Sequence, residues 1–212
     1  MVIAIDGPAG AGKSTVARGL AAELGITYLD SGAMYRCVAL AVSRAVADPD
    51  DPREAAGVAG GLEIAFDGER VLLDREDVTE EIRSPEISAL ASRVSVHPGV
   101  REAMVSRQRD LISRGPYVAE GRDIGTVVSP DSPLKVFLVA NDAERARRRA
   151  AESGRPVEEV LTDLSDRDRR DSEREHGALR AAGDSVEVDT TSLTPDAVVS
   201  RIAALARERG LA

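Results

Sequence analysis

The first loop of the chain reads Gly7-Pro8-Ala9-Gly10-Ala11-Gly12-Lys13-Ser14-Thr15. It matches the pattern G-x-x-x-x-G-K-[ST], in which a loop wraps phosphate. Its glycines let successive backbone N–H groups turn inward on an anion. We therefore predict that this phosphate loop holds a nucleoside triphosphate. Lys13 would reach the outer phosphates, and the Ser14 hydroxyl would join a Mg²⁺ ion that bridges two of them.

The residues on both sides of the phosphate loop support this interpretation. The run Val2-Ile3-Ala4-Ile5 is typical of a buried strand, and Val16, Leu20 and Leu24 recur at helical spacing. The helix that they predict points its positive N-terminus at the bound anion. The fold class is therefore α/β, of the P-loop NTPase type. The loop alone leaves kinases, GTPases and ATPase motors open.

The composition limits the class of protein. A length of 212 residues suits one α/β domain with a small insertion. No run of about 18 apolar residues and no leader is present, so we expect a cytoplasmic protein without a membrane span. The net charge of -9 and the aromatic content of 2% argue against a nucleic-acid-binding surface. The single Cys37 is expected to be a buried thiol.

A second candidate anion site follows the next predicted strand, Thr27–Asp30. Asp30, Ser31 and Arg36 lie close to the start of a helix that should reach about Ala47, with Ser31 as its N-cap. The positive helix end and Arg36 together suit an anion. Spacing alone leaves an ordinary cap with a solvated arginine equally open.

The region that follows differs in character. Asp48-Pro49-Asp50-Asp51-Pro52 breaks the helix, and apolar runs at 62–66 and 71–73 flank a glycine-containing turn, which predicts a β-hairpin. We expect residues 49–85 to form a small insertion and residues 1–48 and 86–212 to form the core domain. Further helices are predicted at about 86–95 and 98–114.

A cluster of charged residues follows the strand predicted at 117–120. Glu120 ends this strand, and Gly121, Arg122 and Asp123 come directly after it. Ligands of open parallel sheets lie beyond the carboxyl ends of the strands. Glu120 could therefore hold a water molecule on Mg²⁺, while the three following residues could contact a second substrate. A salt-bridged turn is the less favoured alternative.

The last third of the chain is rich in arginine. After a strand at 134–139, Asn141 should cap a helix that carries Arg145, Arg148 and Arg149, and Gly154-Arg155-Pro156 separates it from a helix at 157–175. On that second helix, three residues share one face at i, i+4 and i+7: Arg167, Asp171 and Arg174. The two helices are either a solvated charged surface or, as we favour, a mobile lid at about 150–180. A last strand at 185–189 and a helix from Pro195 complete the chain.

Along nearly its whole length the chain resembles the bacterial cytidylate kinases, of the nucleoside monophosphate kinase group. The segments that carry the resemblance are GPAGAGKST at 7–15, LDSGAMYR at 29–36, GRDIGTVV at 121–128, FLVANDAERARRR at 137–149 and DRDRRDSER at 166–174. The resemblance implies a five-stranded parallel sheet flanked by helices, an arginine-rich ATP lid, and an insertion at 49–85 that belongs to the acceptor-nucleotide region. It also implies a monomer with small-molecule substrates.

The resemblance further implies the roles of individual residues. Ser31, Arg101 and Asp123 look like contacts of the cytosine base of the acceptor, with Arg174 nearby. Ser92 and Asp171 look like contacts of its ribose. Arg36, Arg122 and Arg167 resemble the residues that approach its phosphate. Asp30 and Gly121 are included as neighbours in the same site. The phosphate loop would bind ATP.

The expected reaction is transfer of the γ-phosphoryl group from ATP·Mg²⁺ to CMP or dCMP, giving ADP and CDP or dCDP. The accepting phosphate oxygen has a pKa of about 6 and needs no general base at neutral pH. Lys13, Arg145, Arg148 and Arg149 would stabilise the developing charge. A kinase of another small acceptor, with Asp30 or Asp123 as base, stays open. So does a GTPase or nucleotide-sensing module, although the Asn-Lys-x-Asp guanine motif is missing from the sequence.

Overall fold

The computed structural model describes residues 1–211, which fold into two compact units. The first unit comprises Met1–Asp30 and the chain from Arg109 onward, and the second is the continuous stretch Ser31–Gln108. The insertion predicted at 49–85 lies inside the second unit. Among the described residues, no helix has the length and the apolar character that a membrane crossing requires.

The first unit is built on a five-stranded parallel sheet, which confirms the predicted fold. Its strands, in spatial order, are β2 (Thr27–Asp30), β6 (Tyr117–Gly121), β1 (Val2–Asp6), β7 (Leu134–Val139) and β8 (Val186–Asp189). All residues of β1 are buried, as expected for a central parallel strand. The phosphate loop therefore begins at the middle of the sheet.

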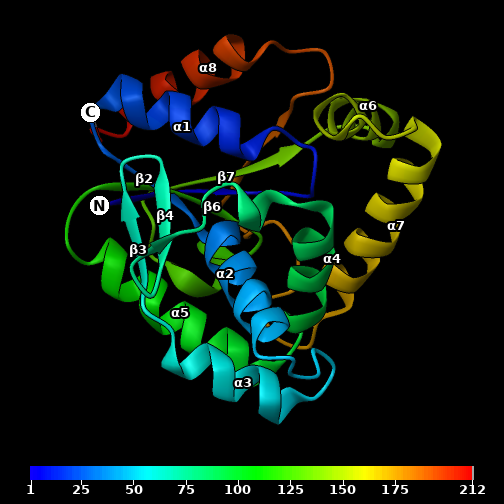
Figure 1. Cartoon of the computed structure of the whole chain (residues 1–212). Helices are drawn as coiled ribbons and strands as arrows, with labels where there is room; N and C mark the ends of the chain where they lie inside the picture. Colours follow the sequence, from blue (N-terminus) through cyan, green and yellow to red (C-terminus); the bar gives the residue numbers. More distant parts are fainter. Residues whose placement is uncertain (212) are drawn as a thin grey trace. The chain divides into compact units, whose positions relative to one another are not determined.

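Two helices of the first unit, α1 (Lys13–Leu24) and α8 (Pro195–Glu208), cover one face of this sheet (Figure 1). Leu20 of α1 and Ile202 of α8 are fully buried in one apolar cluster with Ile3 of β1. Burial of each such side chain stabilises the fold by about 1.5–3 kcal/mol. The cluster fixes the direction of α1, and so the direction of the loop that precedes it.

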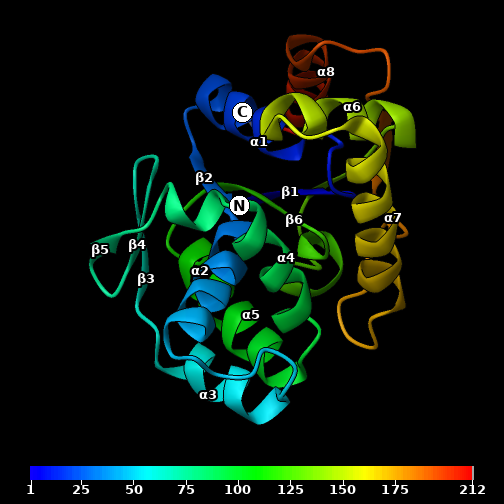
Figure 2. The ribbon, with the colours of Figure 1, turned by 45° about the vertical axis from the view of Figure 1, so that its right-hand side comes forward.

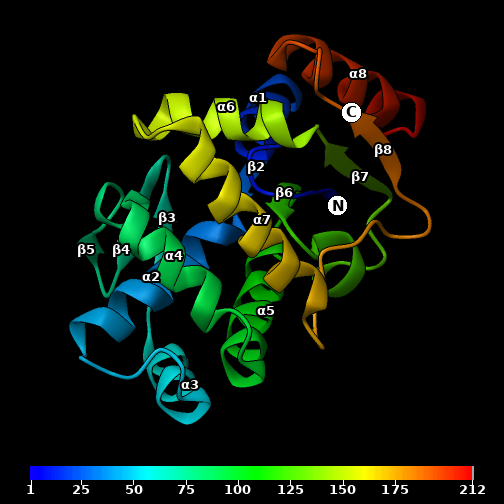
Figure 3. The ribbon, with the colours of Figure 1, turned by 90° about the vertical axis from the view of Figure 1, so that its right-hand side faces the viewer.

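The predicted lid helices are α6 (Asp142–Ser153) and α7 (Val157–Glu173), which meet at a corner (Figure 3). The Asn141 side chain caps α6 by accepting a hydrogen bond from the Glu144 N–H at 2.8 Å, as predicted. An apolar cluster joins the two helices and includes Ala9 of the phosphate loop; its other members are Ala146, Ala150, Val160 and Leu164. These small contacts hold both helices to the loop.

A π-helical turn at Ile124–Val128 lies between β6 and β7 in the chain, and the sequence did not predict it. The N–H groups of Val127 and Val128 both donate to the Asp123 carbonyl oxygen, at 2.8 and 3.2 Å. Such turns are rare and frequently occur at functional sites.

The second unit contains helices and a small antiparallel sheet (Figure 2). Its helices are α2 (Ser31–Arg44), α3 (Pro52–Gly61), α4 (Pro85–Val94) and α5 (Pro98–Ile112), the end of which belongs to the first unit. Its strands are β3 (Ile64–Asp67), β4 (Arg70–Leu73) and β5 (Glu76–Asp77), and a 3₁₀ turn lies at Glu81–Arg83. The predicted hairpin is therefore present, with a third strand added.

Two predicted boundaries in the second unit are wrong. Ser31 is itself the first residue of α2, and not a cap before it. The helix ends at Arg44 instead of about Ala47, because Val46 has a φ of 54°, which is incompatible with a helix. In addition, α3 was not predicted at all; its N-cap is Asp51, which accepts hydrogen bonds from the Arg53 and Glu54 N–H groups.

We expect Gly7→Ala to lower the melting temperature by at least about 5 °C and to abolish ATP binding. Gly7 has a φ of 149°, and a Cβ atom at this position would lie 2.3 Å from the Leu138 carbonyl oxygen of β7. The clash and the backbone strain together should cost about 2–4 kcal/mol. Thermal melting followed by circular dichroism, with ATP binding by calorimetry, measures both effects.

Gly57→Ala is the matched control, because Gly57 lies within α3 and an added Cβ meets nothing within 4 Å. Alanine is the better helix former, so this variant should melt at or slightly above the wild-type temperature. A Gly7→Ala protein with wild-type melting and ATP affinity would contradict the expected clash.

Candidate active site

The phosphate loop is closed by its own lysine. Lys13 begins α1, and its Nζ donates a hydrogen bond to the Pro8 carbonyl oxygen at 2.9 Å. Gly10 and Gly12 have φ values of 78° and 86°, in the left-handed region that glycine adopts readily. The loop therefore has the backbone that its sequence pattern predicts.

The charge of Lys13 is held in an unfavourable environment. Burial lowers the pKa of Lys13 to about 7, and the positive charges of Arg122 and Arg167 act in the same direction. The carboxylates of Glu120 and Asp6 oppose this shift only in part. An anion bound beside Lys13 would stabilise its charged form. The site is thus prepared for a negatively charged ligand.

Glu120 lies at the carboxyl end of β6, directly opposite Asp30 of β2 in the sheet. Burial raises the pKa of Glu120 and the charge of Asp30 adds to this, while Lys13 and hydrogen bonds from Ser14 and Tyr28 act against it. The Tyr28 hydroxyl donates to Glu120 Oε1 at 2.5 Å. The structure thus brings together Ser14 and Glu120, the two residues predicted to serve the metal ion.

Arg145 connects the phosphate loop to both lid helices. Its side chain is buried, and its Nη1 donates to the Ala9 carbonyl oxygen at 3.1 Å. The same guanidinium forms ion pairs with Asp142, at 2.6 Å, and with Asp168 of α7. One arginine thus contacts the loop, α6 and α7.

The other two predicted arginines of α6 differ from each other. Arg148 donates to Glu144 at 2.8 Å and to the Thr190 carbonyl oxygen at 2.7 Å, and a Cβ on Gly12 would lie 3.7 Å from its Nη1. Arg149 instead forms an exposed ion pair with Glu152 at 2.7 Å. Arg148 is therefore beside the phosphate loop, whereas Arg149 pairs with a residue of its own helix.

A buried carboxylate surrounded by arginines is the second charged centre of the first unit. Asp171 of α7 is 1% exposed and accepts a hydrogen bond from Arg122 Nε at 2.8 Å. It also pairs with Arg174, and with Arg167 at 3.9 Å. Burial by itself would raise the pKa of Asp171, but the three arginines outweigh it and hold the pKa below its usual range. The excess positive charge of this arginine cluster suits a phosphate.

Gly121 and Asp123 lie beside this cluster in sequence. Gly121 ends β6 and pairs with Asp6 of β1 in the sheet. Asp123 is buried and immediately precedes the π-helical turn. The predicted acceptor residues of the first unit therefore lie at or directly after the carboxyl ends of β2 and β6, or on α7 and the residue that follows it.

Four predicted acceptor residues belong to the second unit. They are Ser31 and Arg36 of α2, Ser92 of α4 and Arg101 of α5. Ser31, Ser92 and Arg101 are buried, and the Arg101 guanidinium lies over the Tyr35 ring, 5.8 Å from its centroid. Their role as acceptor contacts remains a prediction from the sequence.

Three residues that support the first unit's site were not predicted. Tyr28 orients Glu120 and lies under Arg18, which is 5.3 Å from the centre of its ring. Thr190 Oγ1 lies 3.1 Å from the carbonyl oxygens of Ala11 and Val139, and so ties the phosphate loop to the sheet. Asp6 is a buried carboxylate at the end of β1. An acid directly after an apolar strand was the signal available for Asp6.

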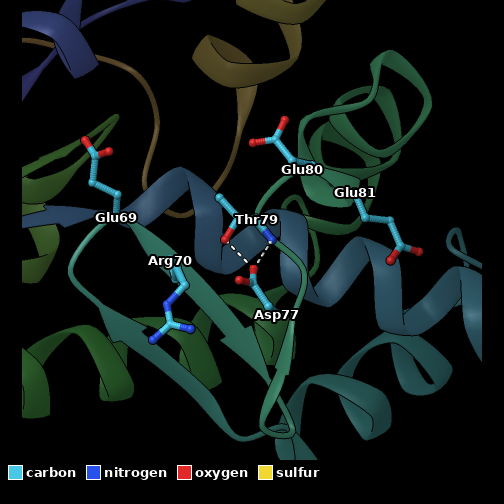
Figure 4. A pocket seen from close by; sticks show the side chains of 6 residues that line it. All are labelled: Glu69, Arg70, Asp77, Thr79, Glu80 and Glu81. Atoms are coloured by element: carbon cyan, nitrogen blue, oxygen red, sulfur yellow. Dashed lines mark hydrogen bonds between the residues drawn. The ribbon is translucent and has the colours of Figure 1, made fainter.

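The hollow shown in Figure 4 belongs to the second unit and is not part of the phosphate loop. Its lining residues are Glu69, Arg70, Asp77, Thr79, Glu80 and Glu81. Asp77 accepts hydrogen bonds from the Thr79 N–H and hydroxyl, at 3.0 and 2.6 Å (Figure 4). This predominantly acidic surface is unsuited to a nucleotide. Another hollow runs along the start of α1, beside Ser14, Thr15 and Arg18.

Known proteins resemble this chain along nearly its whole length. A family model described as cytidylate kinase matches residues 3–208. A cytidylate kinase of Geobacter sulfurreducens is 46% identical over 218 residues, which cover 99% of this chain and 94% of that protein. A cytidylate kinase of Caldanaerobacter subterraneus is 50% identical over 205 residues, covering 94% of this chain and 92% of that protein.

A solved structure supports the fold independently. The shikimate kinase of Acinetobacter baumannii, in complex with shikimate, aligns over 100% of this chain and 95% of its own, with a TM-score of 0.50 and 19% identity. At this identity the likeness concerns the fold alone. The family model and the close relatives, together with the phosphate loop and its arginines, lead to one conclusion: this chain belongs to the cytidylate kinase family.

Proposed function

We propose that this protein transfers the γ-phosphoryl group of ATP to CMP or dCMP, giving ADP and CDP or dCDP. The observation that carries the proposal is the closeness of two cationic centres in the first unit. Lys13 of the phosphate loop lies near enough to Arg122 and Arg167 for their charges to lower its pKa. Two phosphates, one on each centre, would neutralise this repulsion. Membership of the family supplies the identity of the acceptor.

The proposed chemistry needs positioning and charge more than proton transfer. The acceptor phosphate is largely ionised at neutral pH, so its oxygen can attack without a base. Lys13 would bind the donor phosphates, and Arg122 and Arg167 would orient the acceptor phosphate. Arg145 and Arg148, which contact or adjoin the phosphate loop, would stabilise the charge that develops during transfer. Arg149 would first have to leave Glu152.

The residues beside the phosphate loop also fit a magnesium ion bound together with ATP. Mg²⁺ typically takes one or two protein oxygens and completes its shell with phosphates and water. Ser14 and Glu120 offer such oxygens, and they are already joined by a hydrogen bond. Ser14 would coordinate the ion directly and Glu120 would hold one of its water ligands. When bound, the ion neutralises phosphate charge.

The monomeric state and cytoplasmic location predicted from the sequence remain proposals.

A coupled assay of ADP release tests the proposed function. We expect strong stimulation by CMP and dCMP, and little by UMP, AMP or shikimate. Stimulation by shikimate or AMP alone would replace the proposal with a kinase of another acceptor. Absence of stimulation by all five, with GTP hydrolysis in its place, would favour a GTPase switch.

A further inference from the structure

We propose that Asp6 is a positioning residue that orients Arg122 and Asp123 towards the acceptor nucleotide. The proposal rests on the proposed function, because it assigns these two residues to the acceptor. Asp6 ends β1 and directly precedes Gly7 of the phosphate loop. Its carboxylate nevertheless bonds to a segment 118 residues further along the chain. One side chain thereby joins the loop for the donor to the loop for the acceptor.

The contact uses both carboxylate oxygens. Asp6 Oδ1 accepts a hydrogen bond from the Ile124 N–H at 2.9 Å, and Oδ2 accepts one from the Gly125 N–H at 2.8 Å. Hydrogen bonds to a charged group are roughly twice as strong as neutral ones. They are also directional, so the pair fixes where the segment after Asp123 begins.

The π-helical turn needs an acceptor from outside itself. The first N–H groups of any helical turn find no partner within the turn. Here they belong to Ile124 and Gly125, and Asp6 receives both. Asp123 occupies the cap position, yet its side chain makes no capping hydrogen bond. Asp6 caps the turn in its place, so the Asp123 carboxylate does not serve as the cap of this turn.

The other end of the turn is anchored as well. Arg109 donates to the carbonyl oxygens of Val127 and Val128, at 2.7 and 3.2 Å. Asp6 and Arg109 thus hold the two ends of the turn. Arg122 and Asp123 lie between the Asp6-bound end and β6, so their backbone direction is fixed on both sides.

Close packing around Gly125 makes the contact specific. A Cβ atom on Gly125 would lie 3.2 Å from Lys135 Cδ and 3.4 Å from Asp6 Oδ2. Glycine therefore allows the turn to approach the carboxylate closely. A branched side chain at this position would have to displace the Lys135 stem or the Asp6 carboxylate.

Burial of the charged Asp6 carboxylate lowers the stability of the fold, which favours a functional role for this residue. Burial raises the pKa of Asp6 to about 6, and the charge of Asp123 adds to this; the two backbone hydrogen bonds and Lys13 act against it. An uncharged side chain would avoid this desolvation. An asparagine, however, has only one acceptor oxygen and would set its NH₂ group against the second N–H. Only a carboxylate receives both N–H groups.

Asp6→Asn tests the role by separating the two substrates. We expect the KM for CMP to rise at least tenfold, while the KM for ATP stays within about twofold and the melting temperature within about 3 °C of wild type. Asp189→Asn is the matched control, since Asp189 ends β8 and accepts a hydrogen bond from the Thr191 N–H at 2.8 Å. It should leave both KM values within about twofold.

Gly125→Val provides a second route to the same contact, because its branched side chain must displace the Lys135 stem or the Asp6 carboxylate. It should reproduce the selective rise in the KM for CMP. If Asp6→Asn fails to fold, this variant alone tests the proposed role of Asp6. Equal rises in both KM values, or an unchanged KM for CMP, would overturn the role of Asp6. A wild-type protein without CMP-dependent ADP release would instead overturn the proposed function, so the two failures are distinguishable.

Discussion

Lys13→Ala is expected to lower kcat for CMP phosphorylation by about 100- to 1,000-fold while the fold stays intact. Lys13 is the one cation of the phosphate loop itself, and its Nζ lies within the loop, bonded to the Pro8 carbonyl oxygen. Its removal would leave the charge that develops on the transferred phosphoryl group without its nearest counter-charge. Because Lys13 is buried with a depressed pKa, its loss should not lower stability. Steady-state kinetics and thermal melting measure the two quantities.

Lys135→Met is the matched control for this prediction. Lys135 is the only other lysine of the sequence, is 7% exposed like Lys13, and pairs with Asp184 at 2.9 Å. Methionine keeps the apolar stem that packs beside Gly125, so kcat should stay within about threefold of wild type. Wild-type turnover in Lys13→Ala would remove the basis for a phosphoryl-transfer site at this loop.

Asp171→Ala is expected to lower the melting temperature by about 6–20 °C. Its carboxylate is the common partner of Arg122, Arg167 and Arg174, and its removal leaves these charges facing one another. Removing one partner of a buried ion pair typically costs about 3–5 kcal/mol, and each kcal/mol corresponds to about 2–4 °C in a protein of this size. Melting measured at pH 7.5 tests the prediction.

Acid should reduce the difference between Asp171→Ala and wild type. The arginines hold the pKa of Asp171 below that of an aspartate in the unfolded chain, so its stabilising effect is complete above the unfolded pKa of about 4 and is lost as the pH falls through the lower folded pKa. Asp163→Ala is the control on the same helix, because Asp163 pairs with Arg155 in an exposed position worth about 0–1 kcal/mol. If both variants melted alike at pH 7.5, the arginine cluster would have no special dependence on its carboxylate.

The strands of the sheet could be predicted closely from the sequence. Buried parallel strands are continuous apolar runs, so the strands at Val2-Ile3-Ala4-Ile5 and at 134–139 can be recognised from the local sequence alone. The phosphate loop was equally predictable, because its glycines, lysine and serine act within one short segment. In these elements, the residues that determine the structure are neighbours in the sequence.

The remaining parts depend on contacts between distant residues. Asp6 could be read as an ordinary strand end, since its partners lie more than a hundred residues away. The π-helical turn was missed because Gly125-Thr126-Val127-Val128 has no helical periodicity. Adjacent arginines point in directions about 100° apart on a helix, which is why Arg148 and Arg149 could not be distinguished without the structure. The alanine- and glycine-rich α3 likewise carried too weak a pattern.

The connection between the two units has an evolutionary consequence. The second unit is a single uninterrupted segment, Ser31–Gln108, and the strands that flank it in sequence, β2 and β6, pair with each other from Thr27 and Tyr117 to Asp30 and Glu120. Exchange of this segment therefore requires only two junctions in the gene. Such a recombination would replace the whole second unit and leave the coding sequence of the phosphate loop, the sheet and both lid helices untouched.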